Sequence, residues 1–405
     1  MAVTELDVGG AERAFVKIAI GLKSRGWAVN VISLRDAGPL AESLLQAGIS
    51  VEALQCGGFA DFRAINRMKL ALQKNPPAVL LTFLHQANIV GRLAAKRAGV
   101  KTVVCGVRVA DRRWAVRVSE ALTKQHVTHY VAVSRSVAKV HRNLCGIAPG
   151  RVGAIYNGVD LEDIDSAMAV SRTELHCDDE DQVILCVGRL SPQKAPLDIV
   201  EAFDELRRLD PTGHAHRKLV FVGDGPLQPV LKKRIQQKRL EDHVQLLGWR
   251  SDVASVMKSA TVLVLASKWE GLPNVILESQ AAGLPVVASS VDGCMEVIED
   301  GQTGRLFPPG DTHGLAVILQ ELLGSQNSSI NSQCQIQNPR RRHGAHYNSQ
   351  DYSNTAQRDS LVRIATTARK FVAAGFSWEK CISEYDALLR KLQSAESGPS
   401  SLPNR

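Results

Sequence analysis

Short apolar runs alternate with amphipathic stretches along most of the chain. The runs are rich in Val, Ile, Leu and Thr and are bounded by Gly, Pro or charged residues, which is typical of β-strands. Apolar strands separated by helical stretches predict parallel sheets covered by helices on both faces. The predicted strands lie at 27–34, 49–54, 78–84, 101–107 and 128–134, and again at 182–188, 218–223, 244–248, 261–266, 285–289 and 304–307.

The pattern divides the chain into two similar halves. We predict an α/β protein with two Rossmann-like domains, each a doubly wound parallel sheet. The break lies near 157–160, where a Gly-containing turn follows the run RVGAIY. Only MAVTEL precedes Asp7, so the first strand is expected to be short. The predicted helices lie at 10–25, 38–47, 61–74, 87–98 and 134–144, and at 195–208, 227–238, 274–283, 293–299 and 312–324.

The C-terminal part departs from this alternation. Residues 325–357 are dominated by Ser, Asn and Gln and lack apolar periodicity, which predicts a polar insertion without stable order. A helical pattern resumes at 358–374, and the segment FSWEKCISEYDALLRKL predicts a terminal amphipathic helix. The predicted organisation is therefore a first domain at 1–158, a second at 159–375, a terminal helix at 376–393, and a disordered tail at 394–405.

Composition narrows the class of protein. The chain has 405 residues, of which 44% are hydrophobic and 22% charged, as in globular proteins of two or three domains. No run approaches the ~18 apolar residues of a membrane-spanning helix, and the N-terminus lacks the features of a secretory signal. The 8 cysteines show no CxxC spacing, which argues against a zinc ribbon or a disulfide scaffold and favours the cytoplasm.

Charge is distributed unevenly between the halves. Residues 1–158 carry 22 Lys and Arg against 9 Asp and Glu, whereas residues 159–405 carry 27 against 32. This asymmetry suggests different partners for the two halves. The basic half could face an anionic membrane, an acidic substrate or nucleic acid, or it could be a solvated surface with no partner. No known nucleic-acid-binding module accompanies it, so nucleic acid is not an expected partner.

Two glycine-containing loops are candidate phosphate sites. Gly9-Gly10 lies between the first strand and the first helix, where free N–H groups and the helix dipole favour negative charge. In the second half, Arg189 and Lys194 are expected at the carboxyl edge of the sheet, where open α/β sheets bind ligands. A forked guanidinium and an ammonium suit a diphosphate. The plain alternative is a pair of tight turns with incidental charges.

Two further segments carry candidate ligand-binding residues. Gly223-Asp224, at a strand end, forms a tight turn that brings backbone close to a ligand. Glu270 ends a loop, and Glu278 lies inside the helix that follows it. One carboxylate could bind sugar hydroxyls and the other a ribose, while unpaired N–H groups of the first helical turn bind phosphate or hydroxyl oxygens. Taken alone, both glutamates could be solvated residues of a helix face.

In order along the chain, these motifs resemble the retaining glycosyltransferases of family 4, the glycosyl transferases group 1. The resemblance implies the GT-B fold, in which two Rossmann-like domains face each other across a cleft and the terminal helix crosses back to the first domain. The resemblance covers nearly the whole chain, and the ordered set is far more specific than any one motif. The insertion at 325–357 and the short first strand depart from the family pattern. The matching segments are GGAER at 9–13, NGVD at 157–160, VGRLSPQK at 187–194, FVGDGP at 221–226, EGLPNVILE at 270–278, AAGLPVVAS at 281–289, the run at 301–311 and FSWEK at 376–380.

The resemblance implies a reaction and a set of partners. A sugar, such as a hexose, would pass from a nucleotide-diphosphate sugar to a saccharide or lipid-linked acceptor in polysaccharide or cell-envelope biosynthesis, with retention of anomeric configuration. The donor would bind mainly in the second domain and the acceptor mainly in the first. No Asp-x-Asp lies on a suitable loop, and by resemblance neither a metal nor another cofactor is expected.

The resemblance also implies roles for individual residues. Arg189 and Lys194 would hold the donor diphosphate and stabilise the leaving nucleotide, and Glu270 would bind the transferred sugar. The remaining donor-site residues would be Gly10 near the diphosphate, Glu278 on the ribose, Gly223, Asp224 and Trp249 along the base and ribose pocket, and Asn274 and Val275 through their N–H groups.

The first domain offers acceptor candidates. His85 and Arg108 each follow a predicted strand and are expected at strand ends that face the cleft, although His85 could equally be a structural histidine. Many relatives have a histidine where this chain has Arg108, so no catalytic histidine is inferred there. The run Arg108, Arg112, Arg113, Trp114, Arg117 could dock on an anionic membrane or a phosphate-bearing acceptor, or be an ordinary basic helix face. We expect a cytoplasmic enzyme that can contact the inner face of the membrane peripherally.

Two other functions stay open at this point. A nucleotide-sugar epimerase can have the same two-domain fold, but the ordered motif set argues against it. A non-catalytic binding protein of this fold would be expected to lack Arg189, Lys194 or Glu270, and all three are present.

Overall fold

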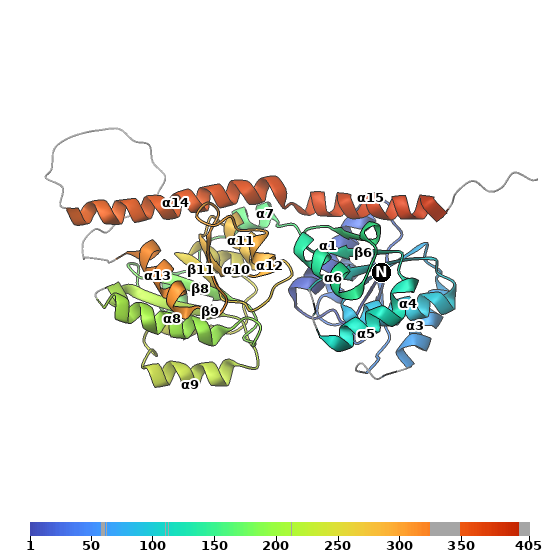
Figure 1. Ribbon diagram of the computed structural model, residues 1–405, viewed down its shortest axis with the longest axis horizontal. Helices are drawn as coiled ribbons and strands as arrows, with labels where there is room; N and C mark the ends of the chain where they lie inside the picture. Colours follow the sequence, from blue (N-terminus) through green and yellow to red (C-terminus); the bar gives the residue numbers. More distant parts are fainter. Residues whose placement is uncertain are drawn as a thin grey trace, which may run out of the picture. The chain divides into compact units, whose positions relative to one another are not determined.

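The computed structural model describes residues 1–57, 61, 63–109, 111, 113–211, 213–324 and 349–396. It divides the chain into two compact units (Figure 1). The first unit is Met1–Val159 together with the helix that follows Phe376, and the second is Asp160–Gly375. Each unit is described by itself below.

Within the described residues, the first unit is built on a seven-stranded parallel sheet in the order β3-β2-β1-β4-β5-β6-β7. The first strand is as short as the sequence predicts, yet it is central, because Ala2 pairs with both Ile32 and Thr82. The strands are β1 (Ala2–Val3), β2 (Asn30–Ser33), β3 (Ser50–Ala53), β4 (Val79–Phe83), β5 (Thr102–Val107), β6 (His129–Ala132) and β7 (Val152–Ala154).

Helices cover this sheet, and the last helix of the chain belongs to the cover. Helix α15 packs on α1, and they approach so closely that a Cβ on Gly21 would overlap the side chain of Ile382. Tyr385 of α15 is fully buried in the same core as Phe83. The helices are α1 (Gly10–Ser24), α2 (Ala41–Gln46), α3 (Arg63–Lys74), α4 (His85–Ala98), α5 (Trp114–Thr123), α6 (Arg135–Cys145) and α15 (Trp378–Glu396), with short 3-10 turns at Lys124–His126 and Pro149–Arg151.

The second unit repeats the arrangement. Its described residues form a six-stranded parallel sheet in the order β10-β9-β8-β11-β12-β13. The strands are β8 (Gln182–Val187), β9 (Arg217–Val222), β10 (Val244–Leu246), β11 (Val262–Leu265), β12 (Val286–Ser289) and β13 (Arg305–Phe307). The helices are α7 (Leu161–Ser166), α8 (Pro196–Leu209), α9 (Gln228–Lys238), α10 (Val253–Lys258), α11 (Asn274–Ala281), α12 (Asp292–Met295), α13 (Thr312–Leu323) and α14 (Ser349–Gly375).

The strand orders fix where each sheet can bind a ligand. In both units the first strand is central, and the chain winds outward on one side before it returns to wind outward on the other. The reversal lies between β1 and β4 in the first unit and between β8 and β11 in the second. Loops at the carboxyl ends of strands beside such a reversal are the usual ligand sites of doubly wound sheets.

The sequence prediction missed the helices α5, α7 and α10, made α12 too long, and started α14 too late. Helix α14 begins at Ser349, nine residues before the predicted 358, so the last part of the predicted insertion is helical, and 325–348 lie outside the described residues. Its early turns carry the polar sequence SQDYSNTAQ, which has no apolar period to reveal a helix. Farther along, Ile364, Ala368 and Val372 are buried, and α14 packs on α11 and α13 (Figure 1).

Helix α5 is absent from the helices predicted above. Its buried positions are Val116, Glu120 and Thr123, two of which are polar, so the apolar periodicity that identifies a core-facing helix is missing. At the end of the chain, α15 extends to Glu396, and the rest of the predicted disordered tail, 397–405, lies outside the described residues.

Candidate functional site

A lysine and a glutamate from two strand-end loops form an ion pair in the second unit. Lys194 Nζ lies 2.5 Å from Glu270 Oε1, although the residues are 76 positions apart. Ser267 Oγ donates to the same oxygen at 2.6 Å. The Glu270 side chain is 8% exposed and that of Lys194 is 21% exposed, so water screens the pair only weakly. The loops after β8 and β11 thus hold a cation and a carboxylate at the strand reversal.

The backbone fixes these loops to one another. Lys268 N donates to Gln193 O at 2.8 Å, and the Gln193 side-chain amide donates to Trp269 O at 2.9 Å. The end of β12 joins them, because Ser289 Oγ donates to Ser267 O at 2.5 Å. A Cβ on Gly293 would lie 2.6 Å from Gly271 O, so only glycine fits this packing. The ion pair is therefore preorganised by three neighbouring loops.

Glycines crowd the ends of β8 and β9. Gly223 has φ +129° and a Cβ there would overlap the carbonyl oxygen of Gly188, which itself has φ +148°. Gly223 N donates to Gly248 O at 2.7 Å, and Asp224 Oδ2 accepts a hydrogen bond from Trp249 N at 3.1 Å. The backbones at the ends of β8, β9 and β10 are therefore in direct contact. The Trp249 ring is 56% exposed and can offer a stacking face to a planar ligand.

The other predicted donor-site residues lie in the same unit. Arg189 follows β8, is exposed, and makes no ion pair with any described residue. Asn274 and Val275 lie in the first turn of α11, where the helix dipole favours anions. Glu278 is half-buried in the second turn of that helix.

We expect Gly223→Ala to lower the free energy of unfolding by about 1–3 kcal/mol, the cost of a strained backbone, and to weaken nucleotide binding by moving Gly188. Urea unfolding and nucleotide titration would measure the two effects. Gly283→Ala is the matched control, because Gly283 also has a positive φ, +72°, but no atom lies within 4 Å of the position of its Cβ. Equal losses in the two variants would mean that crowding at Gly188 has no part in the effect.

The first unit contains the other three predicted residues. Gly10 is exposed at the start of α1, and Glu12 two residues later is partly buried, which raises its pKa. Arg108 follows β5, and one of its terminal nitrogens donates to Asn157 Oδ1 at 2.6 Å. Its guanidinium also lies over the Phe83 ring, 5.1 Å from the centroid. Arg108 is thus fixed at the carboxyl edge of the sheet.

His85 lies at the neighbouring strand end, at the start of α4. Leu84 before it has φ +70° and ψ 150°, a conformation that residues with a Cβ rarely adopt and that clusters at functional sites. The His85 Nε2 atom lies 3.3 Å from Ser119 Oγ of α5. Burial lowers the pKa of His85, so its ring is neutral near pH 7. Its role as an acceptor contact stays a prediction.

Sequence reasoning missed the residues that support Glu270. Ser267 and Ser289 each lie at the end of a strand, where a serine ordinarily marks only a turn. The one sequence feature that could have indicated this support is the position of Ser267, three residues before Glu270. The described residues contain no group of three or more His, Cys, Asp or Glu side chains placed to hold a metal ion. No helix in the described part of the chain is long and apolar enough to span a bilayer.

Comparison with known protein families shows which family this chain belongs to. Residues 8–163 match the model of Glycosyltransferase Family 4, and residues 169–339 match that of Glycosyl transferases group 1. The chain belongs to this glycosyltransferase family. Membership of this family explains why the motifs at both strand reversals occur together in this order.

Curated relatives in this family are enzymes of sugar transfer. The chain is 30% identical over 267 residues to the UDP-Gal:alpha-D-GlcNAc-diphosphoundecaprenol alpha-1,3-galactosyltransferase of Escherichia coli, which covers 62% of this chain and 67% of that enzyme. It is 35% identical to the alpha-D-kanosaminyltransferase of Streptomyces kanamyceticus, over 36% of this chain and only 37% of that relative.

Solved structures have the same fold. The Anabaena protein HepE in complex with UDP and glucose matches with a TM-score of 0.74 at 19% identity, over 96% of this chain and 99% of that one. Sucrose-phosphate synthase from Thermosynechococcus elongatus matches with a TM-score of 0.75 at 18% identity, over 98% and 100%. The two parallel-sheet units are those of the GT-B fold, as the sequence predicted.

Proposed function

We propose that this glycosyltransferase moves a sugar from a UDP-sugar to a hydroxyl of a saccharide carried on a lipid diphosphate, with retention of anomeric configuration. The observation that carries the proposal is the Lys194–Glu270 pair, oriented by Ser267, at the strand reversal of the second unit. The uridine donor is supported by the E. coli relative, whose donor is UDP-Gal, and by the UDP complex of HepE. The acceptor is supported by the diphosphoundecaprenol substrate of the same relative.

The charges at the site suit the transition state of this reaction. Breaking the bond between C1 of the sugar and the phosphate oxygen leaves positive charge on the ring and negative charge on the departing diphosphate. Lys194, held by Glu270, and the exposed Arg189 supply cations to that diphosphate, and preorganised charges such as Lys194 usually contribute most to catalysis. The Oε2 atom of Glu270 accepts no hydrogen bond from the described residues and can accept one from a sugar hydroxyl.

Retention follows from attack on the face that the diphosphate leaves. The acceptor oxygen bonds to C1, the C1–O bond breaks with its electron pair on the phosphate oxygen, and that oxygen accepts the hydroxyl proton. No side-chain base is needed in this scheme, and none is assigned. Glu278 is proposed to bind the ribose, and the exposed Trp249 to stack on the base.

The proposal is tested by incubating the protein with a panel of UDP-sugars and with polyprenyl diphosphate-linked monosaccharide acceptors, and by assigning the product anomer by NMR. The expected product is a disaccharide whose new bond keeps the donor configuration. An inverted product would overturn retention. Conversion of the UDP-sugar to an epimer without any acceptor would replace the transferase proposal with an epimerase.

We expect Arg189→Ala to raise the Kd for UDP by about 10- to 100-fold, because a hydrogen bond to a charged partner contributes about 1.5–3 kcal/mol. Folding should be unaffected, since the side chain is exposed and makes no ion pair with the described residues. Isothermal titration with UDP would measure the change. Lys233→Ala removes an exposed cation of the same unit and should bind UDP normally. An unchanged Kd in Arg189→Ala would remove this arginine from the diphosphate site.

A further inference from the structure

Helix α5 of the first unit exposes three large apolar side chains, whereas two of its three buried residues are polar. Trp114, Val118 and Leu122 are 75%, 46% and 68% exposed. Their spacing of four residues places them in one stripe along the helix. On the opposite face, Glu120 is only 2% exposed. This is the reverse of a helix that is held on its domain by apolar burial.

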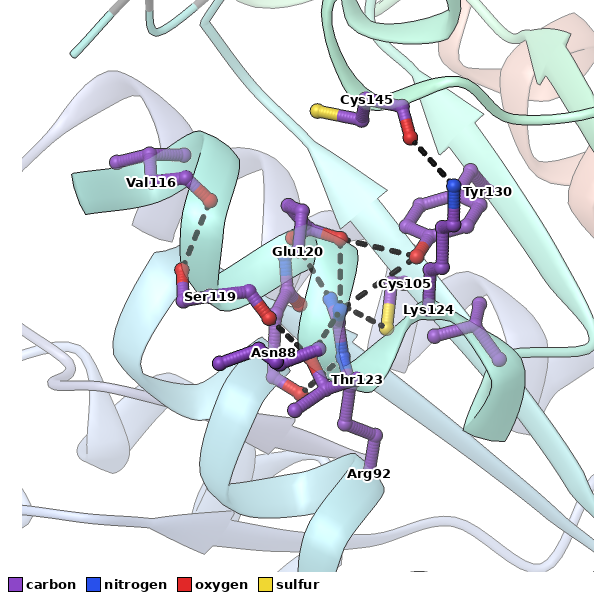
Figure 2. Close-up of polar contacts among 12 residues, drawn as sticks. Asn88, Arg92, Cys105, Val116, Ser119, Glu120, Thr123, Lys124, Tyr130 and Cys145 are labelled. Atoms are coloured by element: carbon purple, nitrogen blue, oxygen red, sulfur yellow. Dashed lines mark hydrogen bonds and ion pairs between the residues drawn. The ribbon is translucent and has the colours of Figure 1, made fainter. Parts of the chain in front are cut away.

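A buried ion pair holds α5 on the domain instead (Figure 2). Arg92 of α4 binds Glu120 through two hydrogen bonds, of 2.7 and 2.9 Å, and both side chains are almost fully buried. Tyr130 of β6 donates to Glu120 Oε2 at 2.9 Å, and Arg92 also donates to Thr123 Oγ1 at 3.1 Å. Because the attachment is polar, the apolar stripe is not needed to anchor the helix.

The part of the sequence that contains α5 is strongly cationic. Residues 62–159 contain 17 Lys and Arg but only two acidic residues, Asp111 and Glu120. Glu120 is buried against Arg92, and Asp111 is paired with Arg113 at 2.5 Å. Arg117, three residues after Trp114, is exposed beside the stripe. On the next helix, Lys139 and Arg142 line a surface hollow. A partner that matches this surface therefore has an apolar region for the stripe and negative charge for the cations.

We propose that α5 is an interfacial helix that docks the first unit on an anionic lipid bilayer. Trp114, Val118 and Leu122 enter the boundary between headgroups and acyl chains, and Arg113 and Arg117 contact lipid phosphates. An aromatic ring at one end of the stripe and arginines with long apolar stems suit that boundary. The inference rests on the proposed function in one respect, that the acceptor is lipid-linked. Docking of α5 would bring the acceptor candidate Arg108 near the membrane that carries such an acceptor.

The test is sedimentation of the full chain with vesicles of phosphatidylcholine, alone or with one third phosphatidylglycerol. We expect binding to be at least tenfold tighter with phosphatidylglycerol and to fall as salt is raised. The triple substitution Trp114→Ser, Val118→Ser, Leu122→Ser should weaken it at least tenfold. Arg117→Glu should weaken it at least fivefold, since one cation at an anionic surface contributes about that factor.

Matched controls separate this surface from general effects. Leu45→Ser, Val230→Ser, Val362→Ser removes three other exposed apolar side chains and should bind vesicles normally. Lys232→Glu reverses an exposed charge of the second unit and should also bind normally. Circular dichroism of each variant verifies folding. Equal vesicle binding by the wild type and the α5 triple variant would overturn the proposal.

Three further measurements distinguish lipid docking from the other possible roles of α5. If the wild type ignores lipid charge, the docking proposal is overturned, whereas the transferase proposal is judged separately by transfer to a short-chain, water-soluble acceptor. If the triple substitution dissociates a dimer in analytical ultracentrifugation, α5 is an interface between copies of the chain instead. If the wild type binds RNA and the triple substitution abolishes that binding without a change in vesicle binding, the partner is a nucleic acid and lipid docking is overturned.

Discussion

Replacing Lys194 with alanine is expected to lower kcat/KM for sugar transfer by about 100- to 1000-fold, the usual loss when one fixed charge that stabilises a transition state is removed. Two effects combine in this variant. The departing diphosphate loses a cation, and Glu270 keeps only the hydrogen bond from Ser267 to orient its carboxylate. Steady-state kinetics with varied UDP-sugar would show the loss, most of it in kcat if Lys194 acts mainly on the transition state.

The neighbouring Lys268 gives the control for this prediction. Its side chain is exposed two residues from Glu270, so Lys268→Ala removes a nearby cation without touching the pair. That variant should retain nearly full activity. The free energy of unfolding of Lys194→Ala is measured beside it, because the lysine also neutralises a glutamate that is 8% exposed. Full activity in a folded Lys194→Ala protein would show that the ion pair is not part of the donor site.

The elements at the two strand reversals could be predicted from sequence because they depend on local patterns. Apolar runs of Val, Ile and Leu identify buried parallel strands, and glycine with charge at their ends identifies strand-end loops. Gly223 illustrates the link, since its positive φ and its contact with Gly188 both require glycine. The family resemblance then selected the residues of these loops that are proposed to bind the donor.

The pairing of Lys194 with Glu270 could not be predicted in the same way. The residues lie 76 positions apart, and the resemblance implied separate roles for them, one on the diphosphate and one on the sugar. Their contact depends on the register of β8 against β11, which periodicity does not give. Helix α5 was missed for a related reason, because the interaction that holds it is ionic and no apolar period marks its buried face.

That ionic attachment leads to the second large expected effect. Glu120→Gln keeps the shape of the side chain but leaves the buried guanidinium of Arg92 without its counter-charge. Breaking one partner of a buried pair costs about 3–5 kcal/mol. Since whole domains are stable by only about 5–15 kcal/mol, the first unit should be close to unfolding. Urea unfolding followed by circular dichroism would measure the change, with Glu42→Gln as a control at an exposed glutamate that should shift stability by less than about 0.5 kcal/mol.

The double variant Arg92→Met, Glu120→Leu distinguishes lost charge from lost packing. Replacing both ions with apolar groups of similar size removes the uncompensated charge, so it should recover much of the stability that Glu120→Gln loses. A double variant as unstable as the single one would mean that packing geometry, and not charge, dominates the cost.

The pair should also give the first unit a dependence on acid pH. Burial alone would raise the pKa of Glu120, but the hydrogen bonds and charge of Arg92 outweigh it and hold the pKa below its usual value. A carboxyl with a lowered pKa stabilises the fold fully above its unfolded value of about 4.3 and loses that contribution as the pH falls through its folded value. Wild type should therefore lose stability below about pH 4 more steeply than the double variant, which lacks the titrating group. Parallel acid profiles for the two proteins would show that Glu120 contributes nothing to the acid sensitivity of α5.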